Sequence, residues 1–180
     1  MIALSNTPVL ETERLILRAP QGADWPYFRD FMPTERARFI SGGTPAEGKH
    51  WRAFGHMIGH WAMRGYGMFV FCEKGSDVPL GATGPWNPAE WPEPEIGWNL
   101  WSPAAEGKGY AAEAARAAIR HVFDDLGWDT AVSFIDLRNS RSIALAERLG
   151  ALRDDAAAVP PADAEGGTIR AWRHPKGSAQ

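Results

Sequence analysis

EGKGYAAEAAR, residues 106–116, is the stretch that decides the fold. Its two glycines, Gly107 and Gly109, lie one residue apart and lead directly into a run rich in alanine. Apolar residues recur there at helical spacing up to Leu126, and Gly127 follows where glycine commonly ends a helix. Glycine adopts left-handed backbone angles that other residues avoid. The stretch therefore predicts a glycine turn with free N–H groups at a helix N-terminus, which is a site for an anion such as phosphate.

The spacing of these glycines separates the known kinds of phosphate loop. A Walker loop needs four residues between its first glycine and a Gly-Lys pair, followed by Ser or Thr, and neither feature is present. A dinucleotide fingerprint of the G-x-G-x-x-A kind fits the letters, with Asp136 as its ribose-binding acid. Residues 102–106, however, separate the glycines from the preceding strand, and too little chain follows for a doubly wound sheet. An NAD(P)-binding oxidoreductase is therefore the least favoured alternative.

Length and composition limit the classes of protein. The 180 residues suit a single domain spanning 1–180, with residues 1–9 as an arm and 174–180 as a polar tail. The formal charge of −3 and the lack of a basic run argue against nucleic acid as a partner. No apolar stretch approaches the ~20 residues of a membrane helix, so no membrane contact is expected. A single cysteine, Cys72, suits a reducing cytoplasm.

The periodicity of apolar residues predicts where the strands and helices lie. Alternating or continuous apolar runs predict strands at residues 10–18, 66–73, 78–86, 95–101, 130–136, 151–153 and 168–173. Helices are expected at 24–31, 36–40, 47–63, 111–126 and 140–149, the third of them starting from a capping box at Thr44, Pro45 and Glu47. The strand, helix and strand between residues 95 and 136 imply a parallel crossover.

Five motifs occur in a fixed order: LETERL at residues 10–15, EIGW at 95–98, GKGYAAEA at 107–114, NSRS at 139–142 and ERLGA at 147–151. In this order the chain resembles the GNAT superfamily of N-acetyltransferases from about Leu10 to Arg173. Within that superfamily it is similar to the ribosomal-protein N-terminal (RimJ/RimL-type) branch. Each motif alone is weak, and the ordered set is specific.

The resemblance implies a mixed α/β fold. Its central sheet is mostly antiparallel, with about six to seven strands, and splays between the fourth and fifth strands, residues 95–101 and 130–136. Acetyl-CoA, the cosubstrate, lies in that gap in the family, with the pantetheine arm along residues 98–101 and the pyrophosphate on residues 107–112. No metal is implied. The cofactor-binding residues carried over are Trp98, Asn99, Leu100, Trp101, Gly107, Lys108, Gly109, Tyr110, Ala111, Ala112 and Asn139.

Catalysis needs a group that takes a proton from the amine and one that supports the leaving thiolate. Glu93 and Glu95 precede or start the fourth strand and are the candidate bases, or else solvated carboxylates that attract a cation. The tyrosine that many family members carry after the fifth strand is replaced by Ala146. Ser142 matches a serine that the related branch uses for the thiolate, or else it caps a helix. Glu106 stands where the family usually has Gln or Arg.

The expected activity is transfer of an acetyl group to a primary amine by direct attack in a ternary complex. The acceptor is a protein or peptide N-terminus or a small cationic amine, because acids such as Glu90, Asp155 and Asp163 are expected around its pocket. A non-catalytic acyl-CoA-binding regulator is the alternative, since the tyrosine is missing. A homodimer is a further expectation, because Trp-rich strands in such folds often meet a partner.

Overall fold

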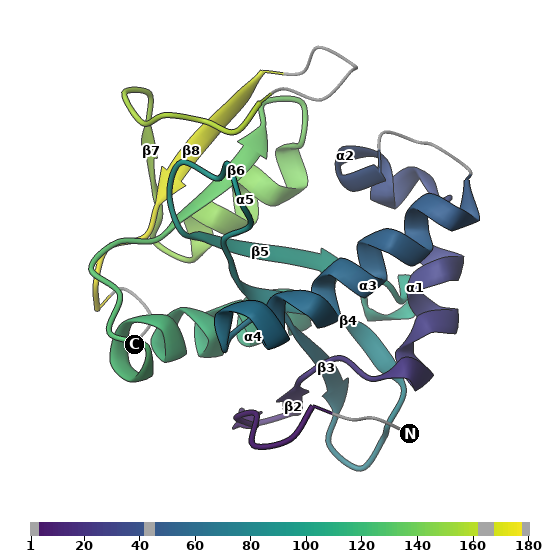
Figure 1. Cartoon of the computed structure of the whole chain (residues 1–180). Helices are drawn as coiled ribbons and strands as arrows, with labels where there is room; N and C mark the ends of the chain where they lie inside the picture. Colours follow the sequence, from purple (N-terminus) through teal and green to yellow (C-terminus); the bar gives the residue numbers. More distant parts are fainter. Residues whose placement is uncertain (1–3, 42–45, 162–167, 178–180) are drawn as a thin grey trace.

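A computed structural model describes residues 4–41, 46–161 and 168–177. Thr44, Pro45 and Asp163, for which a cap and an acceptor-site charge were expected, lie outside them. Within these residues eight strands form one sheet, in the order β1-β2-β3-β4-β5-β6-β8-β7 (Figure 1). The strands are β1 Leu10–Glu11, β2 Leu15–Arg18, β3 Phe69–Glu73, β4 Pro79–Trp86, β5 Glu95–Leu100, β6 Val132–Asp136, β7 Leu152–Asp154 and β8 Ile169–Arg173.

All neighbouring strands are antiparallel except β5 and β6. The mixed, mostly antiparallel sheet is confirmed. The strand count is higher than expected because residues 10–18 form two strands rather than one. Thr12 turns the chain back there: its N–H donates to the carbonyl of Leu15 at 3.0 Å, and its Oγ1 accepts the Leu15 N–H at 2.9 Å.

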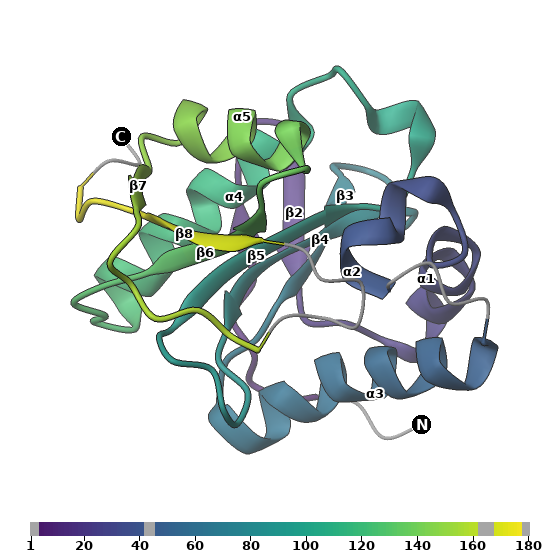
Figure 2. The same cartoon turned by 90° about the horizontal axis from the view of Figure 1, so that it is seen from above.

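Helices cover both faces of the sheet. The α-helices are α1 Trp25–Phe31, α2 Arg38–Ser41, α3 Glu47–Arg64, α4 Tyr110–Arg120 and α5 Ser140–Arg148. Figure 2 shows α3 on one face of the sheet and α4 and α5 on the other. The helix expected at 111–126 changes at His121 into a short π-helical turn that ends at Asp125. None of the helices in the described ranges is both long and apolar enough to cross a membrane.

The central strands are buried on both faces. In β3, Val70 and Cys72 pack toward α1 and α3, whereas Phe69 and Phe71 pack toward α4. Burial of a side chain of this size contributes roughly 1.5–3 kcal/mol. On the α4 face the contact residues are largely alanines, which let the helix lie close to the sheet. Those that are fully buried are Ala114, Ala115 and Ala118.

The strands β5 and β6 separate almost as soon as they meet. They share a single ladder pair, Glu95 with Val132, although each strand runs several residues further. The expected splay between these two strands is therefore present, and α4 begins near its wide end. This opening is the feature from which the candidate site is built.

Candidate active site

The apex of the splayed gap is held by side chains instead of ladder bonds. A main-chain link at the apex is the Val132 N–H, which donates to the carbonyl of Pro94 at 3.1 Å. Beyond it, Ser133 Oγ donates to the carbonyl of Ile96 at 2.7 Å, and the Phe134 N–H donates to the carboxylate of Glu95. These two bonds take the place of strand pairing where the sheet opens.

Glu95 lies at that apex, on the face of the sheet that α3 covers. Its carboxylate is half-buried and accepts the indole N–H of Trp91 at 2.6 Å. Burial raises the pKa of Glu95 to about 7, although the bonds from Trp91 and Phe134 act in the opposite direction. A carboxylate with a pKa near neutrality, held by two donors at the apex of the gap, has the properties of a general base.

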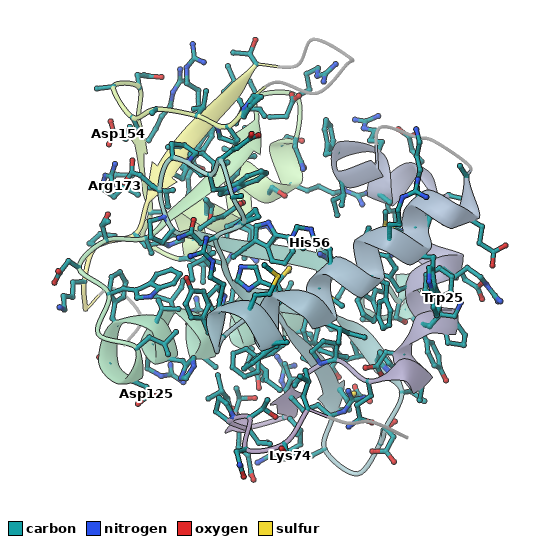
Figure 3. The ribbon with its side chains drawn as sticks, viewed as in Figure 1. Trp25, His56, Lys74, Asp125, Asp154 and Arg173 are labelled. Carbon is teal, nitrogen blue, oxygen red and sulfur yellow. The ribbon has the colours of Figure 1, made fainter. Side chains whose placement is uncertain are left out.

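Glu93, the other candidate base, is engaged elsewhere. Both of its carboxylate oxygens accept from Arg173, at 2.7 and 3.0 Å. Arg173 also donates to Asp154 at 2.8 Å and to Thr130 at 2.6 Å (Figure 3). Bidentate pairing of this kind orients a carboxylate rigidly. Glu93 therefore joins the end of β8 to the loop before β5, and its carboxylate has different partners from that of Glu95.

Ser142 lies on the opposite face, at the start of α5. The side chain of Asn139 caps this helix by accepting the Ser142 N–H at 3.2 Å. The hydroxyl of Ser142 accepts the indole N–H of Trp98 at 3.2 Å, so its own proton remains available for donation. Asn139, and not the hydroxyl of Ser142, therefore caps the helix, and the role of Ser142 toward a thiolate stays a prediction.

One edge of β5 is open toward the gap. Along a strand, alternate residues present their N–H and C=O groups to the same side. The carbonyl of Ile96 points to β6, so the main-chain groups of Trp98 and Leu100 point the same way. Arg36 occupies the carbonyls of Leu100 and Trp101, at 2.9 and 2.6 Å. The N–H groups of Trp98 and Leu100 are therefore suitably placed for a strand-like ligand. Asn99 faces the other way, and its amide oxygen accepts the indole N–H of Trp101.

The glycine loop has the predicted conformation. Gly107 and Gly109 have φ angles of +74° and +80°, in the region that favours glycine, and Gly109 caps α4. Ala111 and Ala112 follow in the first turn of the helix, so their N–H groups have no intrahelical acceptor. The side chain of Tyr110 turns away and donates to Glu73, so it contributes only its N–H to the loop. Lys108 is exposed. These groups fit a pyrophosphate.

Glu106 would repel a pyrophosphate if its charge were free. Two arginines lie next to it instead: Arg36 at 3.6 Å and Arg141 at 3.5 Å. Both come from distant segments of the chain, one before α2 and one in α5. The anion at the first position of the loop is therefore balanced, and sequence reasoning had no means of finding the two partners.

His56 and His60 lie one turn apart on α3, a spacing that can bind metal, but their contacts in the structure are of other kinds. Nδ1 of His60 donates to the carbonyl of Tyr66 at 2.8 Å, and its Nε2 accepts the Asn87 N–H at 3.0 Å. His56 is exposed and contacts the ring of Trp86 where α3 crosses the sheet (Figure 3). Across the described part of the chain, no group of three His, Cys, Asp or Glu side chains is arranged to hold a metal ion.

Sequence reasoning missed three residues that shape the apex: Trp91, Ser133 and His174. Nε2 of His174 lies 2.9 Å from Ser133 Oγ, and because that hydroxyl donates to Ile96 it accepts from the histidine. Burial lowers the pKa of His174 to about 4, which keeps the ring neutral. His174 had been placed in a polar tail, but it is buried. Residues 91–94 are not helical, so the spacing of four between Trp91 and Glu95 gave no signal of their contact.

The acids expected around the acceptor are largely paired. Asp154 binds Arg173, and Asp155 binds Arg153 at 2.7 Å and Arg170 at 3.2 Å. The negative charge expected on this face is therefore compensated by arginines. In contrast to Asp154 and Asp155, Glu95 lies at the gap itself.

Comparison with known proteins agrees with this geometry. A family model described as an acetyltransferase (GNAT) domain matches residues 14–152. The crystal structure of an acetyltransferase from Agrobacterium tumefaciens strain C58 is 34% identical, covers 97% of this chain and 98% of its own, and has a TM-score of 0.84. A chain from Bordetella pertussis assigned to the GNAT family is 25% identical, with 93% and 99% covered and a TM-score of 0.75. A Vibrio cholerae chain assigned as a ribosomal-protein-serine acetyltransferase is 19% identical, with 92% and 98% covered and a TM-score of 0.69, and shows the shared fold alone.

Proposed function

This chain belongs to the acetyltransferase (GNAT) family and is an acyltransferase, and we propose that its donor is acetyl-CoA and its acceptor a primary amine. The observation that carries the proposal is Glu95, a half-buried carboxylate with a pKa of about 7 at the apex of the gap. An amine must lose its proton before it can attack, and a base of this pKa is matched to neutral pH.

In the proposed reaction, Glu95 acts on one face of the sheet and Ser142 on the other. On the α3 face, Glu95 accepts the proton of the substrate ammonium, directly or through one water. The amine nitrogen then forms a bond to the acetyl carbonyl carbon, the carbon–sulfur bond breaks, and the nitrogen releases its second proton to solvent as the amide forms. The N–H of Leu100 faces the gap and stabilises the oxyanion. On the α5 face, the hydroxyl of Ser142 donates to the leaving thiolate. Acetyl-CoA supplies the activated acyl group.

The pKa of Glu95 favours an α-amine over a side-chain amine. An α-ammonium has a reference pKa of about 8 and a lysine-like ammonium one of about 10.4. Proton transfer to a base of pKa about 7 is therefore uphill by about one unit for the first and more than three for the second. Compensation of Asp154 and Asp155 by arginines also removes much of the attraction for a polycation. A peptide or protein N-terminus, as in the RimJ/RimL-type branch, is thus the proposed acceptor class.

Thiol release from acetyl-CoA tests the proposal. The acceptors are short peptides with a free N-terminus, the same peptides with a blocked N-terminus and one lysine, and spermidine. We expect turnover with the free α-amine, and loss of ~10²-fold or more in Glu95→Gln, the usual contribution of a general base. Glu147→Gln, the same change at an exposed position of α5, is the control. Turnover of spermidine alone would contradict the acceptor class, and full activity of Glu95→Gln would contradict the base.

A further inference from the structure

A pocket lined by arginines lies outside the gap, along the exposed side of α4. Its volume is about 480 Å³. It runs from the β1–β2 turn across α4 to the end of α5. The lining residues that matter here are Arg14, Gly109, Glu113, Arg116, Arg120 and Arg148. We call this the arginine pocket.

Two acidic side chains line the pocket: Glu13, which is exposed, and Glu113, whose charge is already satisfied. Glu113 accepts the Arg14 N–H at 2.9 Å and Arg14 Nε at 2.7 Å, and also the hydroxyl of Thr12 at 2.5 Å. These bonds hold the pKa of the Glu113 carboxyl below its usual value, against the opposing effect of burial. Arg14 also donates to the carbonyl of Lys108 at 3.0 Å, so this pair ties the β1–β2 turn to the glycine loop.

Two arginines of the pocket retain free donors. Among the residues that the structure describes, the guanidinium groups of Arg116 and Arg148 make neither an ion pair nor a hydrogen bond. Arg116 is half-buried on α4, and Arg148 is exposed at the end of α5. Two unpaired guanidinium groups that border one pocket are unexpected in a chain whose net charge is −3. Their planar forks are suited to binding the oxygens of a phosphate.

The pocket is continuous with the site proposed for the pyrophosphate. Gly109 and Ala112 belong to both: their N–H groups lie in the first turn of α4, and their outer surfaces line the pocket. A helical side chain leans toward the N-terminus of its helix, so Arg116 extends back toward Ala112. An anion in the pocket would therefore sit beside, and be joined to, a ligand on the glycine loop.

We propose that the arginine pocket binds the 3′-phosphate of coenzyme A. The cofactor carries this phosphomonoester on its ribose, one sugar away from the pyrophosphate, and it is the only other phosphate in the molecule. The inference rests on acetyl-CoA as the donor. It assigns Arg116 and Arg148 to cofactor selection, so the enzyme distinguishes CoA from dephospho-CoA, which differs by that group alone.

Isothermal titration calorimetry of the whole protein tests the site without an acceptor. The ligands are CoA, dephospho-CoA and inorganic phosphate. The proteins are wild type, the double variant Arg116→Gln/Arg148→Gln, and a control, Arg29→Gln/Arg64→Gln, which removes two exposed charges from α1 and α3. Wild type and control should bind CoA about tenfold more tightly than dephospho-CoA, the effect of about one charge-assisted hydrogen bond.

The double variant should lose this preference because its CoA affinity falls about tenfold while its dephospho-CoA affinity stays within about twofold. In wild type the preference should also shrink in 0.5 M salt, since the pocket is open to solvent. Equal binding of CoA and dephospho-CoA by wild type would overturn the 3′-phosphate site and leave the donor intact. A preference that survives in the double variant would place the site elsewhere.

Inorganic phosphate separates a cofactor subsite from a general anion site. Binding of phosphate to wild type that the double variant loses, without any difference between CoA and dephospho-CoA, would assign the pocket to free anions and overturn the inference. Failure of all proteins to bind either form of CoA would instead contradict the proposed donor. Melting temperatures of the three proteins, measured in parallel, identify a variant that fails to fold, and the single variant Arg148→Gln, at an exposed position, then serves in its place.

Discussion

Replacement of Glu95 by glutamine should change how stability depends on pH. The carboxyl has a pKa of 4.5 in its ordinary state and about 7 in the folded protein. The folded state therefore holds this proton more tightly than the unfolded state. The resulting contribution to stability is complete below pH 4.5 and is lost as the pH rises through 7. Glutamine does not titrate, so the variant lacks this dependence.

The size of the effect follows from the shift. A shift of roughly 2.5 pKa units corresponds to about 3 kcal/mol of folding stability. About 2–3 kcal/mol of this stability should be lost as the pH rises from 5 to 8.5. The buried histidines act with the opposite sign. The pKa values of His60 and His174 are lowered, so these groups favour the folded state as the pH rises toward 6.5. They are present in both proteins and cancel in the difference.

Urea unfolding followed by far-UV circular dichroism measures this difference without any substrate. Wild type, Glu95→Gln and the control Glu147→Gln are compared at pH 5 and pH 8.5. From pH 5 to pH 8.5 the free energy of unfolding of Glu95→Gln should rise by about 2–3 kcal/mol relative to that of wild type. The free energy of unfolding of the control should not change relative to wild type. Identical pH dependence in all three proteins would show that Glu95 ionises at an ordinary pKa, and the case for it as the base would fail.

Three further changes have expected outcomes. Glu106→Gln should bind CoA several-fold more tightly in calorimetry, because an anion beside the pyrophosphate is removed and Arg141 loses its carboxylate partner; unchanged or weaker binding contradicts this. Ser142→Ala should lower kcat at least tenfold with little change in KM for acetyl-CoA, because the hydroxyl beside Trp98 acts on the leaving group; an unchanged kcat would leave Ser142 as a helix residue only. Gly81→Ala should lower the free energy of unfolding by at least ~2 kcal/mol, because its Cβ would lie 2.2 Å from the carbonyl oxygen of Asn99; urea unfolding with an unchanged midpoint would contradict that packing.

Features of the structure that depend only on neighbouring residues could be predicted from the sequence. Gly107 and Gly109 could be placed because positive φ angles favour glycine, whereas the cap that Asn139 gives to α5 had not been predicted. Contacts between distant segments could not be read in this way. Arg173 binds Glu93 across 80 positions of the chain. Nothing in the letters around either residue indicates the other, so the two candidate bases could be told apart only in the folded protein.

The alternation of side chains along β5 explains why the proposed proton acceptor, Glu95, and the proposed hydrogen-bond donor, Ser142, lie on different faces of one gap. Glu95 and Trp98 are three residues apart on a strand, and side chains at an odd separation point to opposite faces. Glu95 therefore faces the side of α3, where Trp91 holds it, whereas Trp98 faces α5, where it meets Ser142. The two groups cannot exchange a proton directly. In the proposed reaction the amine would therefore enter from the α3 face and the thiolate would leave toward α5, on either side of the place where β5 and β6 separate.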